Sequence, residues 1–330
     1  MVDLIFEDKD TFLDQTLRPK TLDDFVGQEN IKKSLGVFLK AASKRKEAME
    51  HILLHGPPGL GKTTLAYIIS QELKVPIRTT SGSVIERVGD LAAILTSLSE
   101  NEILFIDEIH RLSKNIEEIL YPAMEDRKID IMVGKGPSAQ VLRLNLPPFT
   151  LIGATTKFAS ISSPMRERFG IIYRLDFYDL EEIKKIIKRS AEILNIGIEP
   201  KAIEEIAKRS RSTPRVANRL LKRVRDFAEV ENKKIIDLSI AKKSLDMLDI
   251  DELGLDSLDR KILKVIAEKF NGGPVGLNAI SLVLSEDKNT LEEICEPYLL
   301  QLGFINRTPR GRVITEKGFR HIKNNKLKLF

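Results

Sequence analysis

Gly56-Pro57-Pro58-Gly59-Leu60-Gly61-Lys62-Thr63 matches the phosphate-loop pattern G-x-x-x-x-G-K-[ST] at every fixed position. The pattern requires a strand before the loop and a helix after it. Residues 51–54 are apolar enough for a short buried strand, and residues 64–73 have the composition of a helix. Because both flanks are in place, a phosphate-binding loop is favoured over a Gly/Pro-rich turn that ends in Lys-Thr by chance.

The loop residues have complementary roles toward a nucleotide. Glycines allow backbone N–H groups to close around phosphate oxygens, and the N-terminus of the following helix adds the positive end of its dipole. Lys62 supplies a point charge for the β- and γ-phosphates of ATP, and the hydroxyl of Thr63 can ligate Mg²⁺. The sequence therefore predicts that ATP and Mg²⁺ bind here.

A second segment ends in a pair of acids. The apolar run 103–106 leads directly into Asp107 and Glu108, which is typical of a buried parallel strand that stops at a site. Asp107 is expected to hold Mg²⁺, directly or through water, and Glu108 to polarise the attacking water as a base. His110 gives a weaker signal, and a surface position on the following helix accounts for it as well.

Two further segments carry polar groups that could reach the same nucleotide. The apolar run 151–154 ends in Thr155 and Thr156, and a hydroxyl at that strand end can contact the γ-phosphate or the water. Arg168 lies shortly before the next expected strand, residues 171–177. An arginine supplied across a subunit boundary stabilises charge on a transferring phosphoryl group. The plainer alternative is a surface Arg–Glu pair with Glu167.

Two smaller units are predicted after this α/β region. Residues 180–250 contain four helical segments with apolar stripes, which indicates a small all-helical bundle. Arg215 begins the third segment, where a cation opposes the helix dipole, so an anionic partner such as a nucleotide phosphate is expected. A linker at 249–254 leads to three helices and a strand–turn–strand, the order of a winged helix. The predicted domains are residues 1–180, 181–253 and 254–330.

The distribution of charge points to a polyanion at the C-terminal end. The net charge is +5, and residues 303–330 contain eight Lys or Arg and one acid, a local balance of +7. The rest of the chain therefore carries 5 − 7 = −2. A solvated charged face is the alternative. Three arginines of the predicted wing would contact phosphates of duplex DNA: Arg307, Arg310 and Arg312.

The remaining composition excludes two classes of protein. The single cysteine, Cys295, rules out an intramolecular disulfide, and a small buried hydrophobe is its expected role. No segment approaches the length of a membrane span, and the N-terminus lacks a basic region followed by a long apolar run. We therefore expect a cytoplasmic protein without membrane contact.

Residues 128–147 form a predicted β-hairpin insertion. Apolar and polar residues alternate on both sides of Gly134-Lys135-Gly136-Pro137-Ser138, which gives the hairpin one apolar face. An exposed apolar hairpin would be a docking surface. A hairpin folded back onto its own domain fits the pattern equally well.

The order of several motifs resembles that of the AAA+ ATPases and, within them, the RuvB family. The motifs lie at residues 17–20, 56–63, 106–112, 120–126, 153–156, 166–170, 213–215 and 307–312. The resemblance extends over about residues 16–315. It implies an α/β fold of the AAA+ class: a P-loop domain with a parallel sheet, a small all-helical lid domain and a C-terminal winged-helix domain.

The resemblance also implies roles for individual residues. In the nucleotide motifs, Lys62 and Thr63 match Walker A together with Gly59, Leu60, Gly61 and Thr64, whereas Asp107 and Glu108 match Walker B. The residues that would sense the γ-phosphate are Thr156 as sensor 1, with Thr155 as the alternative, Arg215 as sensor 2, and Arg168 as the arginine finger of a neighbouring subunit. The adenine-side pocket corresponds to Leu17, Arg18 and Tyr178, and the edge facing the neighbour to Glu125, Asp126 and Arg127. Ser212 departs from the family, which often has glycine there.

The implied activity is that of a motor. A RuvB-like chain would use ATP to move the duplex DNA arms of four-way junctions in homologous recombination and DNA repair. The resemblance implies a homo-hexameric ring, RuvA as a partner docked on the hairpin, and RuvC as a further partner. Two alternatives are another AAA+ ATPase, such as a clamp loader, and a winged-helix DNA-binding regulator switched by ATP. The basic winged helix disfavours the first, and Glu108 disfavours the second, because a switch needs no base.

Overall fold

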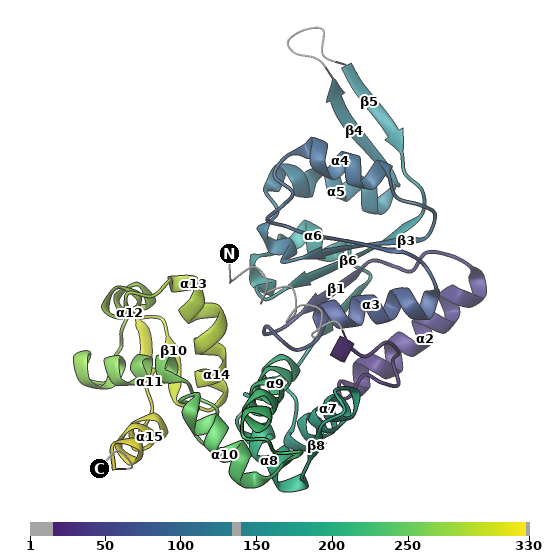
Figure 1. The fold of residues 1–330 in the computed structure, drawn as a ribbon. Helices are drawn as coiled ribbons and strands as arrows, with labels where there is room; N and C mark the ends of the chain where they lie inside the picture. Colours follow the sequence, from purple (N-terminus) through teal and green to yellow (C-terminus); the bar gives the residue numbers. More distant parts are fainter. Residues whose placement is uncertain (1–15, 134–139, 328–330) are drawn as a thin grey trace. The chain divides into compact units, whose positions relative to one another are not determined.

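The computed structural model describes residues 16–133 and 140–327, which divide into two compact units (Figure 1). The α/β unit comprises Arg18–Gly56 and Leu60–Asp176. The second unit comprises Pro57–Gly59 and the chain from Phe177 onward, together with Leu17. Among the described helices, none is long and apolar enough to cross a membrane.

A five-stranded parallel sheet forms the centre of the α/β unit. Its strand order is β2 (Ile77–Ser81), β3 (Glu102–Asp107), β6 (Phe149–Thr155), β1 (Ile52–His55) and β7 (Ile171–Arg174). β6 is buried along its whole length, and β1 and β3 are buried up to their last residue. Such runs are expected where helices cover both faces of a parallel sheet. The predicted P-loop sheet is confirmed.

Helices pack on both faces of this sheet (Figure 1). One face is covered by α2 (Glu29–Arg45) and α3 (Lys62–Leu73), and the other by α4 (Val88–Thr96) and α5 (Lys114–Glu125). The apolar stripes of α4 and α5, including Leu91 and Leu120, pack against Leu104 and Leu151 of the sheet. The described part of this unit also contains three short helices: η1 (Ile109–Arg111), η3 (Phe158–Ser160) and α6 (Ser163–Glu167).

The register of the sheet gathers the predicted site segments. His55 of β1 pairs with Thr155 of β6, and Ile106 of β3 pairs with Gly153 of β6. The carboxyl ends of these parallel strands therefore meet at one edge. The phosphate loop, the acid pair and the two threonines all follow that edge, which is where ligands bind in open α/β sheets.

The hairpin consists of β4 (Lys128–Val133) and β5 (Gln140–Asn145), paired antiparallel. The predicted turn, residues 134–138, lies outside the described residues. At the base, Ile129 is buried, and Ile131 packs against the core of the α/β unit. Farther out, Val141 is 64% exposed and Leu142 is 49% exposed. The hairpin thus folds its base onto its own unit and exposes apolar side chains beyond it.

The second unit begins with the predicted helical bundle. Its helices are α7 (Leu180–Ile193), α8 (Pro200–Lys208), α9 (Pro214–Val230) and α10 (Leu238–Met247). A short parallel pair, β8 (Gly197–Ile198) and β9 (Ile235–Ile236), joins two of its loops. Pro200 and Pro214 occupy the first turn of their helices, where the missing N–H costs nothing.

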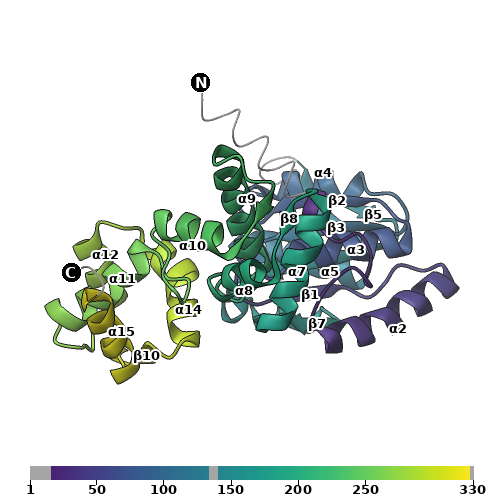
Figure 2. The ribbon, with the colours of Figure 1, turned by 60° about the horizontal axis from the view of Figure 1, so that its bottom comes forward.

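The winged helix follows (Figure 2). It contains α11 (Ser257–Lys264) with the π-helical turn η4 (Val265–Lys269), α12 (Leu277–Leu284), α13 (Lys288–Thr290), η5 (Leu291–Cys295), α14 (Glu296–Gln301), β10 (Ile305–Thr308) and β11 (Gly311–Ile314). Cys295 is buried in its core, and burial raises the pKa of the thiol. Both observations agree with the expected role of Cys295 as a small buried hydrophobic residue. A final helix that the sequence pattern did not predict, α15 (Glu316–Leu327), follows β11.

The expected linker is an ordered connection. The carboxylate of Asp251 accepts the backbone N–H groups of Leu253 and Leu255, each at 2.9 Å. The same side chain lies 2.8 Å from Nε2 of His321 on α15. The C-terminal helix therefore fastens the segment that joins the helical bundle to the winged helix.

Candidate functional site

The phosphate loop is held in conformations that suit glycine. φ is +141° at Gly56 and +101° at Gly61. A β-carbon at Gly56 would lie 2.4 Å from the carbonyl oxygen of Leu175, so no other residue fits there. Lys62 begins α3 and donates to the Gly56 carbonyl at 2.8 Å. Burial lowers the pKa of Lys62 to about 8 against the opposing effect of Glu108 and Asp107. An anion in the loop would stabilise the charged form and raise this pKa again.

Asp107 and Glu108 have different hydrogen-bond partners. The Asp107 carboxylate accepts a hydrogen bond from the Thr63 hydroxyl, and burial raises the pKa of this acid. Glu108 has a φ of +45° and follows the end of the strand. Its carboxylate accepts the hydroxyl of Thr156 at 3.2 Å and the backbone N–H of the same residue at 3.4 Å.

His110 is a second partner of Glu108, so the surface position considered for it is wrong. Its side chain is only 8% exposed, and Nδ1 lies 3.1 Å from Glu108 and 2.9 Å from the Thr155 hydroxyl. The chain makes the short turn η1 here before α5 begins at Lys114, and this turn directs His110 back toward the strand ends. Burial opposes ionisation of Glu108, but hydrogen bonds from His110 and Thr156 outweigh it and hold the pKa below its usual value.

The two candidate threonines have different surroundings. Thr156 contacts Glu108, whereas Thr155 is fully buried, contacts His110 and accepts the backbone N–H of Lys157 at 2.9 Å. Of the two, Thr156 alone directs its hydroxyl to the acid proposed as base. This difference favours Thr156 over Thr155 for the sensor 1 position.

Arg168 is folded against its own subunit. It donates to the carbonyl of Pro164 at 2.7 Å, lies 3.2 Å from Glu125 and stacks over the Tyr121 ring at 4.3 Å. The predicted neighbour-facing residues Glu125, Asp126 and Arg127 are all exposed at this same edge. The edge thus carries both an arginine and the acids expected opposite a second subunit.

Of the remaining nucleotide candidates, Arg215 lies at the start of α9 and Tyr178 contacts the loop before it, whereas Leu17 contacts α7. Tyr178 is buried and donates its backbone N–H to Ser212 at 3.0 Å, and Arg215 donates its backbone N–H to Gly59 at 3.4 Å. Leu17 is buried, and its carbonyl accepts Arg189 of α7 at 2.9 Å. In the α/β unit, the Arg18 guanidinium lies 5.6 Å from the centre of the Tyr67 ring.

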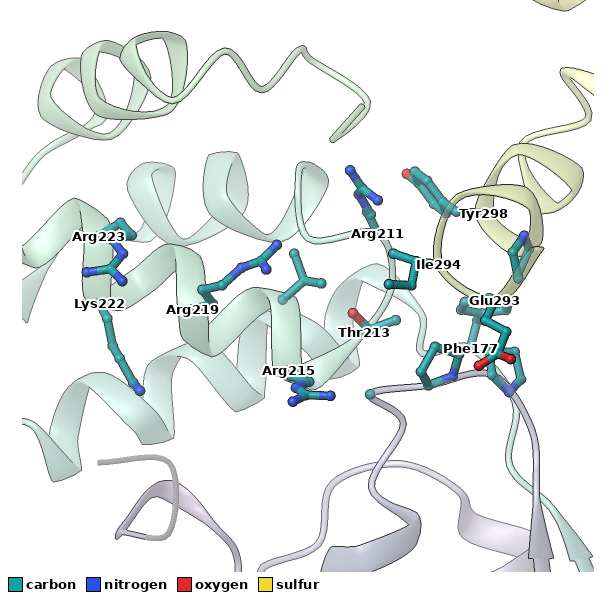
Figure 3. Close-up of a pocket in the computed structure, with 15 residues that line it drawn as sticks. Phe177, Arg211, Thr213, Arg215, Arg219, Lys222, Arg223, Glu293, Ile294 and Tyr298 are labelled. Atoms are coloured by element: carbon teal, nitrogen blue, oxygen red, sulfur yellow. The ribbon is translucent and has the colours of Figure 1, made fainter. Parts of the chain in front are cut away.

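A pocket of about 460 Å³ opens beside α9 (Figure 3). Cations line one side, among them Arg215, Arg219 and Arg223, and apolar groups line the other, among them Phe177, Ile294 and Tyr298. Burial and the charges of Arg211, Arg215 and Arg223 lower the pKa of Arg219. A cluster of like charges favours an anion among them. The sequence signal for Arg219 and Arg223 was their spacing, i+4 and i+8 from Arg215 on one helix face.

The three wing arginines are not equivalent. Arg307 and Arg312 each donate two hydrogen bonds of 3.0 Å to Glu296, whose side chain is 4% exposed. These bonds hold the pKa of Glu296 below its usual value despite burial. Arg312 is itself only 16% exposed. Arg310, at the turn between the strands, is exposed. Glu296 was not singled out from the sequence.

Comparisons with known proteins agree along nearly the whole chain. Three family models match in order: the Holliday junction DNA helicase RuvB P-loop domain at residues 17–175, the RuvB AAA lid domain at 178–251, and the RuvB C-terminal winged helix domain at 252–323. Two relatives are Holliday junction branch migration complex subunits RuvB. The one from Fusobacterium nucleatum is 55% identical over 96% of each chain, and the one from Dehalococcoides mccartyi is 59% identical over 95% of this chain and 90% of that protein.

Solved structures that match this chain include RuvB proteins as well. The Thermotoga maritima RuvB Holliday junction branch migration motor superposes with a TM-score of 0.86 at 54% identity, covering 93% of this chain and 98% of that one. A mutant of the same Thermotoga maritima protein gives a TM-score of 0.87 at 55% identity over the same shares. The P-loop domain, helical lid and winged helix predicted from the sequence are thereby confirmed, and the chain belongs to the RuvB family.

Proposed function

We propose that this protein is the ATP-driven motor of Holliday-junction branch migration, acting in homologous recombination and DNA repair. One observation carries the proposal. Lys62 follows β1 and the pair Asp107 and Glu108 lies at the end of β3, two strands that both pair with β6, and these residues occur in one chain with an arginine-bearing winged helix. The chain thus combines a nucleotide hydrolase with a duplex-binding module.

ATP is assigned to the phosphate loop. Gly59, Leu60, Gly61, Lys62, Thr63 and Thr64 surround the phosphates; Leu17, Arg18 and Tyr178 form the adenine side; and Arg215 contacts the γ-phosphate. Burial lowers the pKa of the Lys62 amine to about 8, and a phosphate beside it would stabilise the charged form. The same attraction would stabilise the bound anion.

Mg²⁺ is assigned to Thr63 and Asp107. Their oxygens are hydrogen-bonded neighbours, and burial raises the pKa of Asp107. A cation beside them would favour the ionised acid, so these residues fit the ion. When bound, Mg²⁺ would neutralise charge on the phosphate oxygens.

Hydrolysis is assigned to Glu108 with Thr156. Glu108 orients the attacking water, and its hydrogen bonds to His110 and Thr156 keep the carboxylate ionised. Arg168 contributes its charge to the nucleotide of the next subunit in a homo-hexameric ring, with Glu125, Asp126 and Arg127 on the facing edge. In the single chain, Arg168 pairs with Glu125, and it would exchange this partner on assembly.

The winged helix is assigned to the duplex arms of four-way junctions. Arg310 is exposed and makes the primary phosphate contact, with Arg307 and Arg312 beside it. Phosphate contacts suit a motor because they carry no sequence preference. The domain bounds proposed for this division of labour remain 1–180, 181–253 and 254–330.

Two partners follow from the proposed role. The exposed side chains of Val141 and Leu142 on the 128–147 hairpin supply an apolar surface for RuvA. RuvC is the proposed resolving partner of the same assembly. A cytoplasmic location fits a protein that acts on chromosomal DNA.

Branch migration of a synthetic four-way junction tests the proposal. The wild-type chain is expected to separate the junction with ATP, with and without RuvA as parallel arms, and Lys62→Ala is expected to lose both ATP binding and migration. Duplex-stimulated hydrolysis without migration in either arm would favour a different AAA+ ATPase such as a clamp loader. ATP-dependent DNA binding without hydrolysis would favour a regulator.

A further inference from the structure

The loop between α8 and α9, residues 209–213, holds an unfavourable backbone conformation. φ is +54° at both Arg211 and Ser212, the left-handed region that side chains with a β-carbon rarely adopt. Two such residues in succession persist only where surrounding contacts hold them. The contacts on the two sides of this loop lead to different parts of the second unit.

On one side, the loop contacts the proposed nucleotide residues. The Ser212 carbonyl accepts the backbone N–H of Tyr178 at 3.0 Å, and Arg215 donates its backbone N–H to Gly59 at 3.4 Å. A β-carbon on Gly59 would lie 3.1 Å from the Arg215 β-carbon, so the two backbones approach closely. Movement of the phosphate loop at Gly59 would therefore displace this end.

On the other side, Arg211 fastens the loop to the start of the winged helix. Its guanidinium donates to the Gly254 carbonyl at 2.9 Å and pairs with Asp256 at 2.6 Å and Asp259 at 2.7 Å. Asp256 caps α11 by accepting two of its backbone N–H groups. Figure 3 shows Arg211 directed toward Tyr298, whereas Arg215 points away from it. Arg211, which belongs to the loop before α9, is thus bound to the first turn of α11, the first helix of the winged helix.

The link is buried at Arg211 and fully buried at Asp259, whereas the Asp256 side chain is 42% exposed. The Tyr298 ring lies 5.8 Å from the guanidinium, and its hydroxyl donates to the Leu253 carbonyl at 2.6 Å. Because the planar guanidinium of Arg211 binds three oxygen partners, it fixes both the distance and the angle between its loop and the start of α11, which a lysine ammonium cannot do.

We propose that Arg211 is a positioning residue that couples the nucleotide at Arg215 to the DNA at the winged helix. The inference rests on the proposed function, since it takes ATP at one end of the loop and duplex at the other. A shift of the loop at Arg215 would move the guanidinium of Arg211, and with it the N-terminal end of α11, which Asp256 caps. The coupling therefore passes through the short stretch of chain from Arg211 to Arg215.

The same loop offers a matched control. Arg209 is as buried as Arg211, but its partners are Glu205, Asp246 and the Ile250 carbonyl, all within the lid residues 178–251. Arg209→Lys therefore disturbs a buried arginine fork without touching the winged helix. A purely structural role for Arg211 predicts the same effects from both substitutions.

The test is equilibrium linkage in the full-length protein. The dissociation constant of a non-hydrolysable ATP analogue is measured with and without saturating duplex DNA, and unfolding is followed for each variant. Wild type and Arg209→Lys are expected to show a ratio of about fivefold or more between the two constants. Arg211→Lys is expected to bring the ratio to within about twofold of one, while binding each ligand separately.

A second variant protects the test from misfolding. Asp256→Asn keeps a good helix cap but removes the charge that Arg211 grips, so it should also reduce the ratio. A ratio preserved in both Arg211→Lys and Asp256→Asn overturns the inference, and so does an equal loss in Arg209→Lys. A wild-type chain that binds ATP and duplex independently overturns it too, whereas a wild-type chain that binds neither refutes the proposed function itself.

Discussion

Replacing Arg312 with alanine should destabilise the protein while leaving the salt dependence of its DNA binding unchanged. Arg312 makes two of the four hydrogen bonds that reach Glu296, and it is 16% exposed while Glu296 is 4% exposed. Removing one partner of a buried ion pair costs about 3–5 kcal/mol. Arg307 remains bound to Glu296, so we expect a smaller loss, about 2–3 kcal/mol.

Arg310→Ala is the matched contrast. Its side chain is exposed at the turn of the wing, so its removal should change stability by no more than about 0.5 kcal/mol. If Arg310 contacts one phosphate, the slope of log K against log salt should fall by about 0.9. For Arg312→Ala, that slope should stay unchanged, because the guanidinium of Arg312 is already hydrogen-bonded to Glu296.

A double-mutant cycle measures the pair directly. In a Glu296→Gln background the buried charge is gone, so Arg312→Ala should cost less than about 1 kcal/mol, giving a coupling of at least about 1 kcal/mol. Chemical denaturation gives the stabilities, and fluorescence anisotropy of labelled duplex at several salt concentrations gives the slopes. An Arg312→Ala variant that keeps its stability and lowers the salt slope as much as Arg310→Ala does would show that Arg312 binds DNA rather than Glu296.

Four other perturbations follow from the site and the lid. Arg168→Ala should bind ATP normally but lose hydrolysis by roughly 10³-fold or more, and mixing it with Glu108→Gln subunits should restore part of the turnover; no restoration at any mixing ratio would rule out action across subunits. His110→Ala removes a hydrogen bond that lowers the pKa of Glu108, so the acidic limb of the pH profile of kcat should move to higher pH. A limb that does not move would show that His110 does not set this pKa. Burial raises the pKa of Asp259 to about 7, so this acid stabilises the folded form fully below its unfolded pKa of about 3.9 and loses that contribution as pH rises through 7. Between pH 5 and 7 the stability of wild type should fall by about 2 kcal/mol relative to Asp259→Asn, and parallel curves would contradict this. Ser212→Gly should raise the stability by about 1 kcal/mol, since φ there is +54°, and a loss measured by denaturation would show that the serine side chain contributes.

The residues proposed for the nucleotide site could be selected from the sequence because their signals are local. Lys62 and Thr63 are fixed by the loop pattern, and Asp107 follows an apolar strand, so spacing and period alone identify them. Parallel strands then bring these ends together whatever the intervening helices contain. Thr156, expected to reach the γ-phosphate or the water, directs its hydroxyl to Glu108 at 3.2 Å in the structure.

Partners distant in sequence were not predictable in the same way. Glu296 lies 11 residues from Arg307 and 16 from Arg312, and no local pattern distinguishes it from the neighbouring acids of the same helical segment. Its burial appears only when the wing packs back on α14. His110 was misjudged for a related reason: a short turn replaced the expected continuous helix, and that turn reversed the direction of the side chain.

Ser212 shows why a departure from a family pattern can be tolerated at one position and not at its neighbour. Both Ser212 and Arg211 have φ of +54°, so glycine would relieve strain at either one. At Ser212, the tertiary contact is made by the backbone carbonyl, which accepts Tyr178 and is the same in every residue type. At Arg211, the contact is made by the side chain, which forms ion pairs with Asp256 and Asp259. The strain at Arg211 is therefore the cost of the link to the winged helix, whereas the strain at Ser212 can be removed without breaking any connection.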